Sequence, residues 1–456
     1  MTNSNGTPKK AFRSRVLIII LVVALLPLLV VSVKRLEGRH PDLNLDAFSS
    51  AIGSERIIRG EAADPDSGIR RVWIGLIQGG KEKVVFEKDF PGSIGWGAGD
   101  QRKVPIDITL RPKDLGFVDG EALLRVAVWD HSWRSWFKGN HAYLEKTVLI
   151  DTRPPEISVV TRIHNVAQGG TGLLRYRLSE DCPRSGVLVG DRFYPGYATT
   201  GGDMLVYFAI GHDQPTSVPL SVTATDAAGN SSRAGFPHHI RRTRFKQDTI
   251  TLSKRFLDWK MPDFFPDQPA ADALALLDQF LKVNRDVRAE NYTQITAVTR
   301  HSDPDTHWQG AFRRMPAATR ATFGDRRVYR YNGQEVDRQV HLGIDLASLA
   351  HSKIPAANAG RVAFVGNVGI YGKTVIIDHG YGLFSLYSHL NEISIAKGQE
   401  VIKGTELGRT GTTGLAGGDH LHFGMMVHDT FVNPLEWWDA QWIANNITGK
   451  LTPAAN

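Results

Sequence analysis

An apolar run near the N-terminus limits what this chain can fold into more than any other feature. The residues from Val16 to Val33 carry no charge, and only Pro27 and Ser32 interrupt the apolar series. A run of this length is at the lower limit for spanning a hydrocarbon core of roughly 30 Å. Four basic residues precede it, which favours an N-terminus that stays in the cytoplasm. We therefore predict a transmembrane signal anchor over this run.

Two alternatives for the run are weaker. A cleaved signal peptide needs a small-x-small cleavage site, and the stretch Val31-Ser-Val-Lys-Arg35 offers none. A buried core helix is disfavoured by the flanking charges. We therefore expect a cytoplasmic basic tail over residues 1–15 and an uncleaved anchor over residues 16–33. Everything after about residue 40 then lies outside the cytoplasm.

Charge and cysteine content exclude two classes of function. The formal net charge is +7, and seven basic and three acidic side chains place +4 of it within residues 1–46. The rest of the chain has no basic stripe with interleaved aromatic residues, so we expect no nucleic-acid partner. Cys182 is the single cysteine, which rules out an intrachain disulfide and a cysteine-based zinc site.

Short apolar segments separated by glycine, aspartate and proline predict two β-sandwiches, over residues 55–152 and 153–244. Residues 124–130 and 220–226 match in pattern at an offset of 96 residues, which is about the size of one immunoglobulin-like (Ig-like) sandwich. The pair Pro154-Pro155 falls in the expected linker. We interpret the two Ig-like modules as a spacer or as a docking stalk for an envelope protein partner.

The second half of the chain changes character. Residues 245–330 read as a partly helical connector, because apolar residues recur at helical spacing after Pro269. Strand patterns with glycine-rich turns return over residues 331–440 and predict a compact, mostly antiparallel β domain. Residues 441–456 read as a C-terminal tail. The predicted fold class is therefore mainly β, with one N-terminal transmembrane helix.

Three histidine motifs in this last domain indicate metal chemistry: His341-Leu-Gly-Ile-Asp345, Tyr387-Ser-His389 and His420-Leu-His422. A catalytic zinc ion uses three protein ligands of this type and leaves one position open for water. His420 and His422 are two apart on a predicted strand and point to the same face. His341 and Asp345 are four apart, which fits one face of a strand or of a helix. Gly343 and the surrounding β pattern favour a strand or a strand-to-loop position.

These motifs resemble the M23 family of zinc metallopeptidases, the lysostaphin-type or LytM-domain family. The resemblance runs in order over about residues 341–435 and includes the segments Gly360-Arg-Val-Ala, Tyr371-Gly-Lys-Thr-Val, Gly411-Thr-Thr-Gly and Val432-Asn-Pro. It implies that His341, Asp345 and His422 bind Zn²⁺. It also implies that His389 and His420 are the catalytic imidazoles. Which of the two accepts the water proton and which stabilises the oxyanion stays open.

The resemblance implies a membrane-anchored zinc metalloendopeptidase that hydrolyses peptide bonds in the stem peptides or crosslinks of bacterial peptidoglycan. The family also contains members that recruit or activate another cell-wall hydrolase without cleaving, and this is the alternative function. The anchor favours a single-pass protein of the bacterial inner membrane, with its catalytic domain in the periplasm. The connector could in addition fold over the groove and inhibit the site.

The remaining histidines are expected to be structural or superficial. His379 lies on a neighbouring predicted strand, where a structural role is expected. His351, His428 and the pair His238-His239 have no partner at ligand spacing and are expected at the surface.

Overall fold

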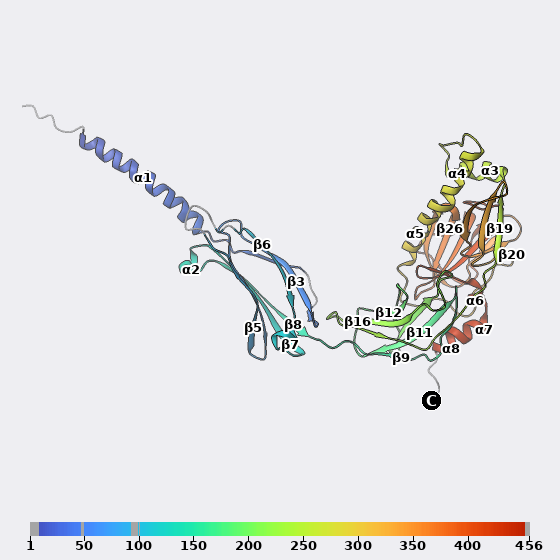
Figure 1. The fold of residues 1–456 in the computed structure, drawn as a ribbon, viewed down its shortest axis with the longest axis horizontal. Helices are drawn as coiled ribbons and strands as arrows, with labels where there is room; N and C mark the ends of the chain where they lie inside the picture. Colours follow the sequence, from blue (N-terminus) through green and yellow to red (C-terminus); the bar gives the residue numbers. More distant parts are fainter. Residues whose placement is uncertain (1–8, 47–49, 93–98, 100, 452–456) are drawn as a thin grey trace, which may run out of the picture. The chain divides into compact units, whose positions relative to one another are not determined.

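The chain divides into two compact units. The computed structural model describes residues 9–46, 50–92, 99 and 101–451 (Figure 1). One unit comprises residues 1–154 and 225–230, and the other comprises residues 155–224 and 231–456. The predicted cytoplasmic and C-terminal tails lie partly outside the described residues, at 1–8 and 452–456.

The first unit begins with helix α1 (Lys9–Arg35), which contains the apolar run. Its segment Arg15–Val33 has a mean hydropathy of 3.4 and is long and apolar enough to cross a membrane. A signal sequence near the N-terminus has the same length and composition. The helix is therefore a candidate membrane span.

Two sheets follow α1 and enclose one core, and all their strand pairs are antiparallel except β2 with β8. The three-stranded sheet has the order β1-β3-β6 and the five-stranded sheet has the order β2-β8-β7-β4-β5. Burial alternates strictly along β6, as the period of two residues in a strand requires. The elements are β1 (Asp42–Leu45), β2 (Ala51–Ile52), β3 (Arg56–Ala63), β4 (Ile69–Gln78), β5 (Lys81–Asp89), β6 (Lys103–Leu110), η1 (Pro112–Leu115), β7 (Gly120–Asp130), α2 (Arg134–Phe137) and β8 (His141–Ile150).

The next block is built from two four-stranded sheets, β14-β15-β11-β9 and β13-β12-β16-β17, and from the parallel pair β10-β18. Its strands are β9 (Ile157–Val159), β10 (Asn165–Ala167), β11 (Thr171–Leu178), β12 (Arg184–Val189), β13 (Arg192–Pro195), β14 (Tyr197–Ala198), β15 (Met204–Ala209), β16 (Leu220–Thr225), β17 (Ser231–Ala234) and β18 (His239–Arg241). We refer to this block as the second sandwich.

The sequence repeat corresponds to a repeated contact at the end of a strand. Asn140 donates its side-chain amide to Asp130 at 2.9 Å, and Asn230 donates to Asp226 at the same distance. Both aspartates also accept the backbone N–H of their asparagine. The two repeats therefore share a strand-ending turn as well as a hydrophobic pattern.

The connecting region combines three helices with a small sheet. Helix α4 begins where Asp272 accepts hydrogen bonds from the N–H groups of Leu274 and Ala275, and it buries Leu276 and Phe280, which are one turn apart. The elements are β19 (Gln247–Leu252), α3 (Lys254–Phe264), α4 (Ala273–Lys282), the π-helical turn η2 (Val283–Val287), α5 (Arg288–Thr299), β20 (Ala318–Ala321), β21 (Arg326–Tyr331) and β22 (Gln334–Val340). Strands β19, β21 and β22 pair in that order.

A ten-stranded, mostly antiparallel sheet carries the predicted site. Its main path is β20-β23-β30-β27-β26-β25-β28, and β24, β29 and β31 attach at its margins. The elements are β23 (Ile344–Ala347), β24 (Lys353–Pro355), β25 (Gly360–Val368), η3 (Gly369–Tyr371), β26 (Gly372–Asp378), β27 (Leu383–Ile393), β28 (Glu400–Val401), β29 (Glu406–Thr410), β30 (Leu421–Val427), β31 (Thr430–Val432), α6 (Pro434–Trp438), α7 (Ala440–Ile443), η4 (Ala444–Thr448) and α8 (Gly449–Leu451). The prediction of a mainly β chain with many antiparallel sheets is confirmed.

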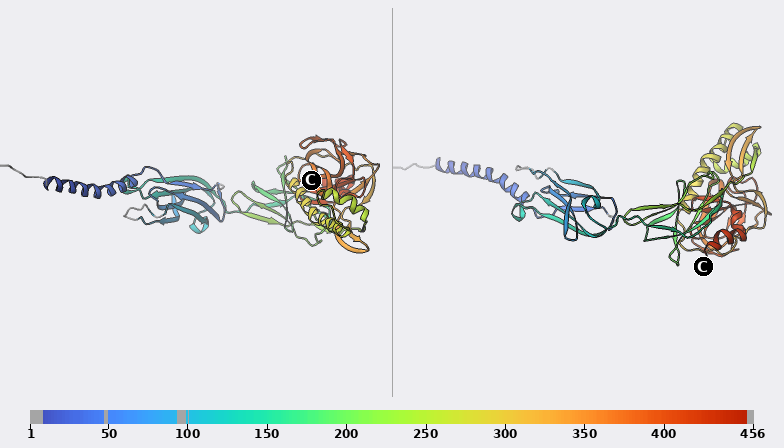
Figure 2. Two further views of the ribbon diagram at one scale, coloured as in Figure 1. Left: turned by 90° about the horizontal axis from the view of Figure 1, so that it is seen from above. Right: turned by 60° about the horizontal axis from the view of Figure 1, so that its bottom comes forward.

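The second sandwich and the ten-stranded sheet share one hydrophobic core that extends from Val166 to Ile447. Tyr207 of β15 packs edge-on against Trp437 of α6, with ring centroids 6.0 Å apart. Figure 2 shows two further views of the chain; within this unit helix α5 packs on strand β25 of the sheet, and α3 packs on α4. The residues predicted as a C-terminal tail are helical up to Leu451, and Arg175 of β11 donates to the carbonyl of Leu451.

Candidate metal centre

The predicted ligands come together at the centre of the sheet. Strands β23 and β30 are antiparallel neighbours, and their register places Asp345 directly opposite His422. His341 lies in the short loop between β22 and β23. The next strand, β27, places Ser388 opposite His422 and His389 one residue further on. Residues far apart in the sequence therefore converge because three strands pair.

Three ligand atoms lie within hydrogen-bond distance of one another. His341 Nε2 lies 3.0 Å from Asp345 Oδ1, and His422 Nδ1 lies 2.9 Å from the same oxygen. The two imidazole nitrogens are themselves 3.0 Å apart. Ligands of one tetrahedral zinc ion, bound at about 2.0–2.1 Å, are separated by about 3.3 Å. An outward shift of a few tenths of an ångström would therefore admit an ion.

Backbone carbonyls determine which nitrogen of three histidines is free. His341 Nδ1 contacts the carbonyl of Thr322 at 3.0 Å, His389 Nδ1 contacts that of Thr413 at 2.8 Å, and His420 Nδ1 contacts that of Gly418 at 2.8 Å. A carbonyl oxygen only accepts, so Nδ1 must donate in each ring. The neutral ring then keeps its lone pair on Nε2. For His341 that lone pair is the one directed at Asp345 and His422, which fits a metal ligand.

Asp345 is held as a carboxylate whose two oxygens face different partners, Oδ1 the histidines and Oδ2 an arginine. Burial acts to raise the pKa of Asp345, yet the charge and hydrogen bonds of His341 and the bonds of the two neighbouring histidines hold it well below its usual value. Arg327 of β21 donates to Oδ2 at 3.2 Å. Because Oδ2 is engaged by the guanidinium, Oδ1 is the oxygen that could bind a metal.

Gly343 provides the space for the ring of His422. A Cβ atom at this position would lie 2.5 Å from His422 Nε2 and 2.8 Å from the carbonyl oxygen of Phe423. In the part of the chain that the structure describes, the buried Nε2 of His422 has no hydrogen-bond partner. The imidazole is therefore positioned by close packing on a glycine, with Nδ1 turned toward the other ligands.

A backbone irregularity brings His389 to the same site. His389 has φ = 65°, a left-handed conformation that is uncommon outside glycine, and the pairing of β27 shifts register on both sides of it. Its ring centroid lies 4.8 Å from that of His420 and 5.9 Å from that of His422. Burial, and after it the charges of His420 and His422, lower the pKa of His389 well below its usual value. His389 is thus held as a neutral base.

His420 differs from His389 in its surroundings. Its Nε2 lies 3.5 Å from Asp345 Oδ1. Burial acts to lower the pKa of His420, but the hydrogen bond and the charge of Asp345 outweigh it and raise the pKa. The structure therefore brings all five predicted side chains together in one pocket and gives the two remaining imidazoles different proton affinities.

Comparison with known proteins agrees with this arrangement. The sequence pattern of the family described as Peptidase family M23 matches residues 339–434, which contain the five side chains. This chain carries a C-terminal M23 peptidase domain.

Named relatives of the M23 domain occur in Neisseria and Vibrio. Over 97 residues the chain is 37% identical to the DD-carboxypeptidase/endopeptidase Mpg of Neisseria meningitidis, which covers 21% of this chain and 22% of that protein. Over 134 residues it is 31% identical to the peptidoglycan DD-endopeptidase ShyA of Vibrio cholerae, which covers 28% of this chain and 30% of that protein. The chain thus spans less than a third of the length of these curated relatives.

Among solved structures, the chain is similar to a crystal structure of a candidate M23 peptidase from Pseudomonas aeruginosa. The similarity covers 60% of this chain and 95% of that chain, at 21% sequence identity and a TM-score of 0.39.

The M23 domain surrounds the ligands with a cavity of about 130 Å³, which we call the metal pocket. All five predicted side chains line it. The connecting region contributes Arg288, Arg327 and Tyr329 to the same lining. No sequence pattern indicated Arg288 or Arg327, because each is separated from the histidine motifs along the chain and belongs to a segment without a motif.

The other histidines of the M23 domain have structural positions, and one prediction about them is wrong. His379 is fully buried, with Nδ1 2.7 Å from the carbonyl of Ala359 and Nε2 2.7 Å from the hydroxyl of Ser385. His351 is exposed, as are His238 and His239. His428, expected at the surface, is only 5% exposed and stacks on Tyr197 of the second sandwich. Its burial follows from packing between β14 and the end of β30, which no local pattern indicates.

Proposed function

We propose that this chain is a zinc endopeptidase that hydrolyses peptide bonds in the stem peptides or crosslinks of bacterial peptidoglycan. One observation carries the proposal: the ligand atoms of His341, Asp345 and His422 converge within 3.0 Å, beside the imidazoles of His389 and His420. Two relatives of the M23 domain are named as endopeptidases, one of them as a peptidoglycan DD-endopeptidase, and this supports the substrate class.

In the proposed reaction, His341, Asp345 and His422 hold Zn²⁺. The ion supplies a water of lowered pKa and polarises the scissile carbonyl. Arg327 keeps Asp345 directed toward the ion by engaging its other oxygen. Ligand partners of this kind typically contribute ten- to a hundredfold to metal affinity.

His389 and His420 are the proposed catalytic imidazoles. His389, neutral and with its lone pair on Nε2, is suited to accept the proton of the attacking water. His420 has the higher proton affinity, so it is suited to donate a hydrogen bond to the oxyanion and a proton to the leaving amine. The carbonyl of Thr413 accepts from Nδ1 of neutral His389 and so leaves the lone pair on Nε2. The carbonyl of Gly418 accepts from Nδ1 of His420, so the proton that His420 would donate is the one on Nε2 of its protonated ring.

The decisive experiment uses the purified full chain in detergent with crosslinked muropeptides. We expect the zinc-loaded protein to cleave them, with the products identified by mass spectrometry. A chelator should abolish cleavage and zinc should restore it. His422→Ala should lose zinc and more than about a hundredfold of the activity, because one of three ligands is removed.

The same experiment distinguishes the proposed peptidase from the alternative function. A protein that binds zinc and peptidoglycan with all five side chains intact, yet cleaves no muropeptide, would instead be a LytM-domain protein that recruits or activates another hydrolase. In that case, adding it to a cell-wall amidase should raise the amidase rate.

We also propose that α1 anchors the protein in the inner membrane, with the N-terminus in the cytoplasm and the M23 domain in the periplasm. The apolar length of α1 and the basic residues before Val16 support this topology. Protease added to the periplasmic side of spheroplasts should digest the M23 domain. Protection of that domain would contradict the topology. In the proposed topology, the sandwich modules also lie in the periplasm, where an envelope protein partner can bind them.

A further inference from the structure

A second and larger cleft adjoins the metal pocket. Its volume is about 860 Å³, and four residues line both spaces: Arg288, Arg327, Leu342 and Tyr371. We call it the arginine cleft, because its lining contains five arginines, namely Arg285, Arg288, Arg326, Arg327 and Arg338. No aspartate or glutamate is among its lining residues. The cleft is therefore a basic extension of the metal pocket.

Three of the five guanidinium groups have acidic partners outside the lining. Arg285 lies 3.0 Å from Asp337, and Arg338 makes a two-pronged contact with Glu335. Arg327 is paired with Asp345, the proposed metal ligand. These contacts hold the arginines in place and balance part of their charge.

The other two guanidinium groups are not balanced by an acid in the described part of the chain. Arg288 donates to the backbone carbonyl and the side-chain oxygen of Asn284, at 3.1 and 2.6 Å, and both acceptors are uncharged. Arg326 is exposed at the start of β21, and its guanidinium makes no hydrogen bond or ion pair with the described residues. Two guanidinium groups that line the cleft therefore form no ion pair with a carboxylate of the described residues.

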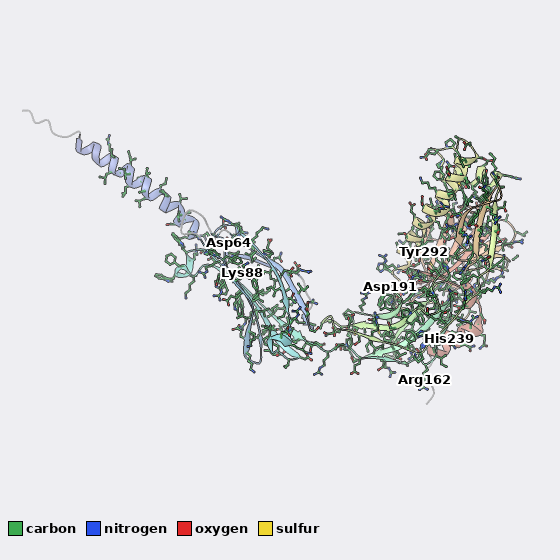
Figure 3. All side chains as sticks on the ribbon, in the orientation of Figure 1. Asp64, Lys88, Arg162, Asp191, His239 and Tyr292 are labelled. Carbon is green, nitrogen blue, oxygen red and sulfur yellow. The ribbon has the colours of Figure 1, made fainter. Side chains whose placement is uncertain are left out.

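These arginines come from the connecting region. Arg285 and Arg288 are one helical turn apart on η2 and α5, while Arg326 and Arg327 lie on β21 and Arg338 on β22. Tyr292, labelled in Figure 3, lies on α5 and also lines the cleft. All five arginines lie outside residues 339–434, the segment matched by the M23 pattern. The arginines of the cleft thus come from outside the matched segment, while Leu342 and Tyr371 within it also contribute to the lining.

We infer that the arginine cleft binds a free carboxylate of the peptide substrate, beside the bond that is cleaved at the metal pocket. This inference rests on the proposed peptidase function. Guanidinium groups bind carboxylates with two parallel charge-assisted hydrogen bonds, and a concave surface of one sign concentrates anions. Peptidoglycan stem peptides carry free carboxylates close to their amide bonds. Because the two spaces share a wall, one peptide can occupy both.

A carboxylate site beside the metal pocket should make the enzyme select substrates by their negative charge. A substrate whose carboxylates are converted to amides keeps its length and shape but loses the ionic contact with Arg288 and Arg326. We therefore expect the enzyme to prefer stem peptides with free carboxylates over amidated ones. A charge-assisted hydrogen bond of this kind corresponds to roughly a tenfold difference or more in kcat/KM.

The test compares two crosslinked muropeptide dimers that differ only in amidation of their free carboxylates. The proteins are the wild-type full chain, Arg326→Gln, Arg288→Gln and the double variant. Arg330→Gln is the matched control, because Arg330 lies on the same strand as Arg326 but does not line the cleft. Zinc content and the melting temperature of each variant establish that the fold and the metal pocket are intact.

We expect the wild type and Arg330→Gln to cleave the free-carboxylate dimer at least about tenfold more efficiently than the amidated dimer. The double variant should lose this preference, because its cleavage of the free-carboxylate dimer should slow by at least about tenfold more than its cleavage of the amidated dimer. Equal cleavage of both dimers by the wild type, or unchanged selectivity in the double variant, would overturn the inference and leave the proposed function standing.

If the wild type cleaves neither dimer, the proposed function fails and binding decides the inference. Calorimetric titration should then show tighter binding of the free-carboxylate dimer to the wild type than to the double variant. Equal affinities would reject the cleft as a carboxylate site. Inorganic phosphate is included as a competitor. Strong arginine-dependent binding of phosphate without discrimination between the dimers would overturn the inference in favour of a phosphate-bearing ligand.

Discussion

Backbone carbonyl groups decide which nitrogen of each imidazole faces the metal pocket. Thr322, Thr413 and Gly418 each accept from an Nδ1 atom and leave Nε2 available. His422 is the exception, because it presents Nδ1 and packs its Nε2 against Gly343. The orientation of the imidazoles therefore depends on backbone carbonyl groups and on a glycine, and not only on the histidines themselves.

Gly343→Ala tests this dependence. The added methyl group would lie 2.5 Å from His422 Nε2, so the ring must move and Nδ1 must leave the other ligands. We expect zinc affinity to fall about ten- to a hundredfold, as for other changes that misdirect a ligand. Zinc titration with a competing chelator measures it.

Gly418→Ala is the matched control, because a Cβ atom there meets nothing within 4 Å and the backbone carbonyl that holds His420 is retained. Equal zinc affinities of the two alanine variants would show that the close packing of His422 on Gly343 is unimportant.

His379 predicts an acid-sensitive fold. Burial lowers the pKa of His379 to about 4, from an ordinary value of 6.5. The unfolded chain therefore binds a proton between these values that the folded chain does not, and stability falls as pH decreases from 6.5 toward 4. The expected slope is about 1.4 kcal/mol per pH unit for this one group.

Urea denaturation between pH 7.5 and 4.5 measures the slope. In His379→Gln the slope should be shallower by about that amount, even though the variant is less stable at every pH because it weakens the bonds to Ala359 and Ser385. Identical slopes would mean that another group accounts for the acid sensitivity.

At the scale of elements, the helices of the connecting region support the loops of the M23 domain. Lys260 of α3 is only 1% exposed and donates to the carbonyl of Thr412 at 2.6 Å. The next residue, Thr413, holds His389 through its own carbonyl. One helix that lies outside the family match therefore supports the loop that orients a proposed catalytic base.

Lys260→Met should loosen this loop. The variant keeps most of the apolar stem but leaves the carbonyl of Thr412 without its donor, which costs about 1–3 kcal/mol. We expect lower stability in urea and a lower kcat, with zinc still bound. Lys254→Met on the same helix is the control, because Lys254 is exposed and pairs only with Asp258, so its removal should change stability by less than about 0.5 kcal/mol. Equal stability and equal kcat of the two variants would show that the bond from Lys260 to Thr412 does not support the loop.

At the scale of the whole molecule, the M23 domain is not separated from the second sandwich. Tyr194 of β13 and Thr430 of β31 share a hydrogen bond of 2.8 Å, and Glu436 accepts from the N–H of Thr171 at 2.8 Å. Together with the contact between Tyr207 and Trp437, these form part of one continuous core. The peptidase and the sandwich are therefore expected to fold as one cooperative unit.

Fragments of the chain test this expectation. Residues 155–456 should unfold in a single transition. Residues 331–440 alone would expose Trp437 and the strands of the shared core, and should be less stable by on the order of 3–5 kcal/mol, the usual cost of losing one buried aromatic contact surface. Thermal and urea denaturation of both fragments measure the difference. A fragment 331–440 as stable as the longer one would show that the domain folds independently.

Much of this architecture could be predicted from local sequence patterns. The M23 domain was identified from ordered motifs, and the family match confirms it. Strand alternation and glycine-rich turns indicated a mainly β chain, because every second side chain of a strand points to the buried face of its sheet. The apolar run from Val16 to Val33 likewise predicted helix α1. In an apolar environment, a single stretch of eighteen uncharged residues can satisfy its backbone polar groups only as a helix.

The sequence by itself thus determined the candidate metal-ligand motifs, the strand character and the apolar helix, because each of these depends on a short stretch of consecutive residues. Tertiary structure alone decided that Arg327 reaches Asp345, that His428 is buried on Tyr197, and that a basic cleft extends the metal pocket. These contacts join segments separated by 18 residues in the first case and by 231 in the second. These contacts arise from strand pairing and from packing in a shared core. Neither process produces a sequence pattern that identifies which residues come into contact.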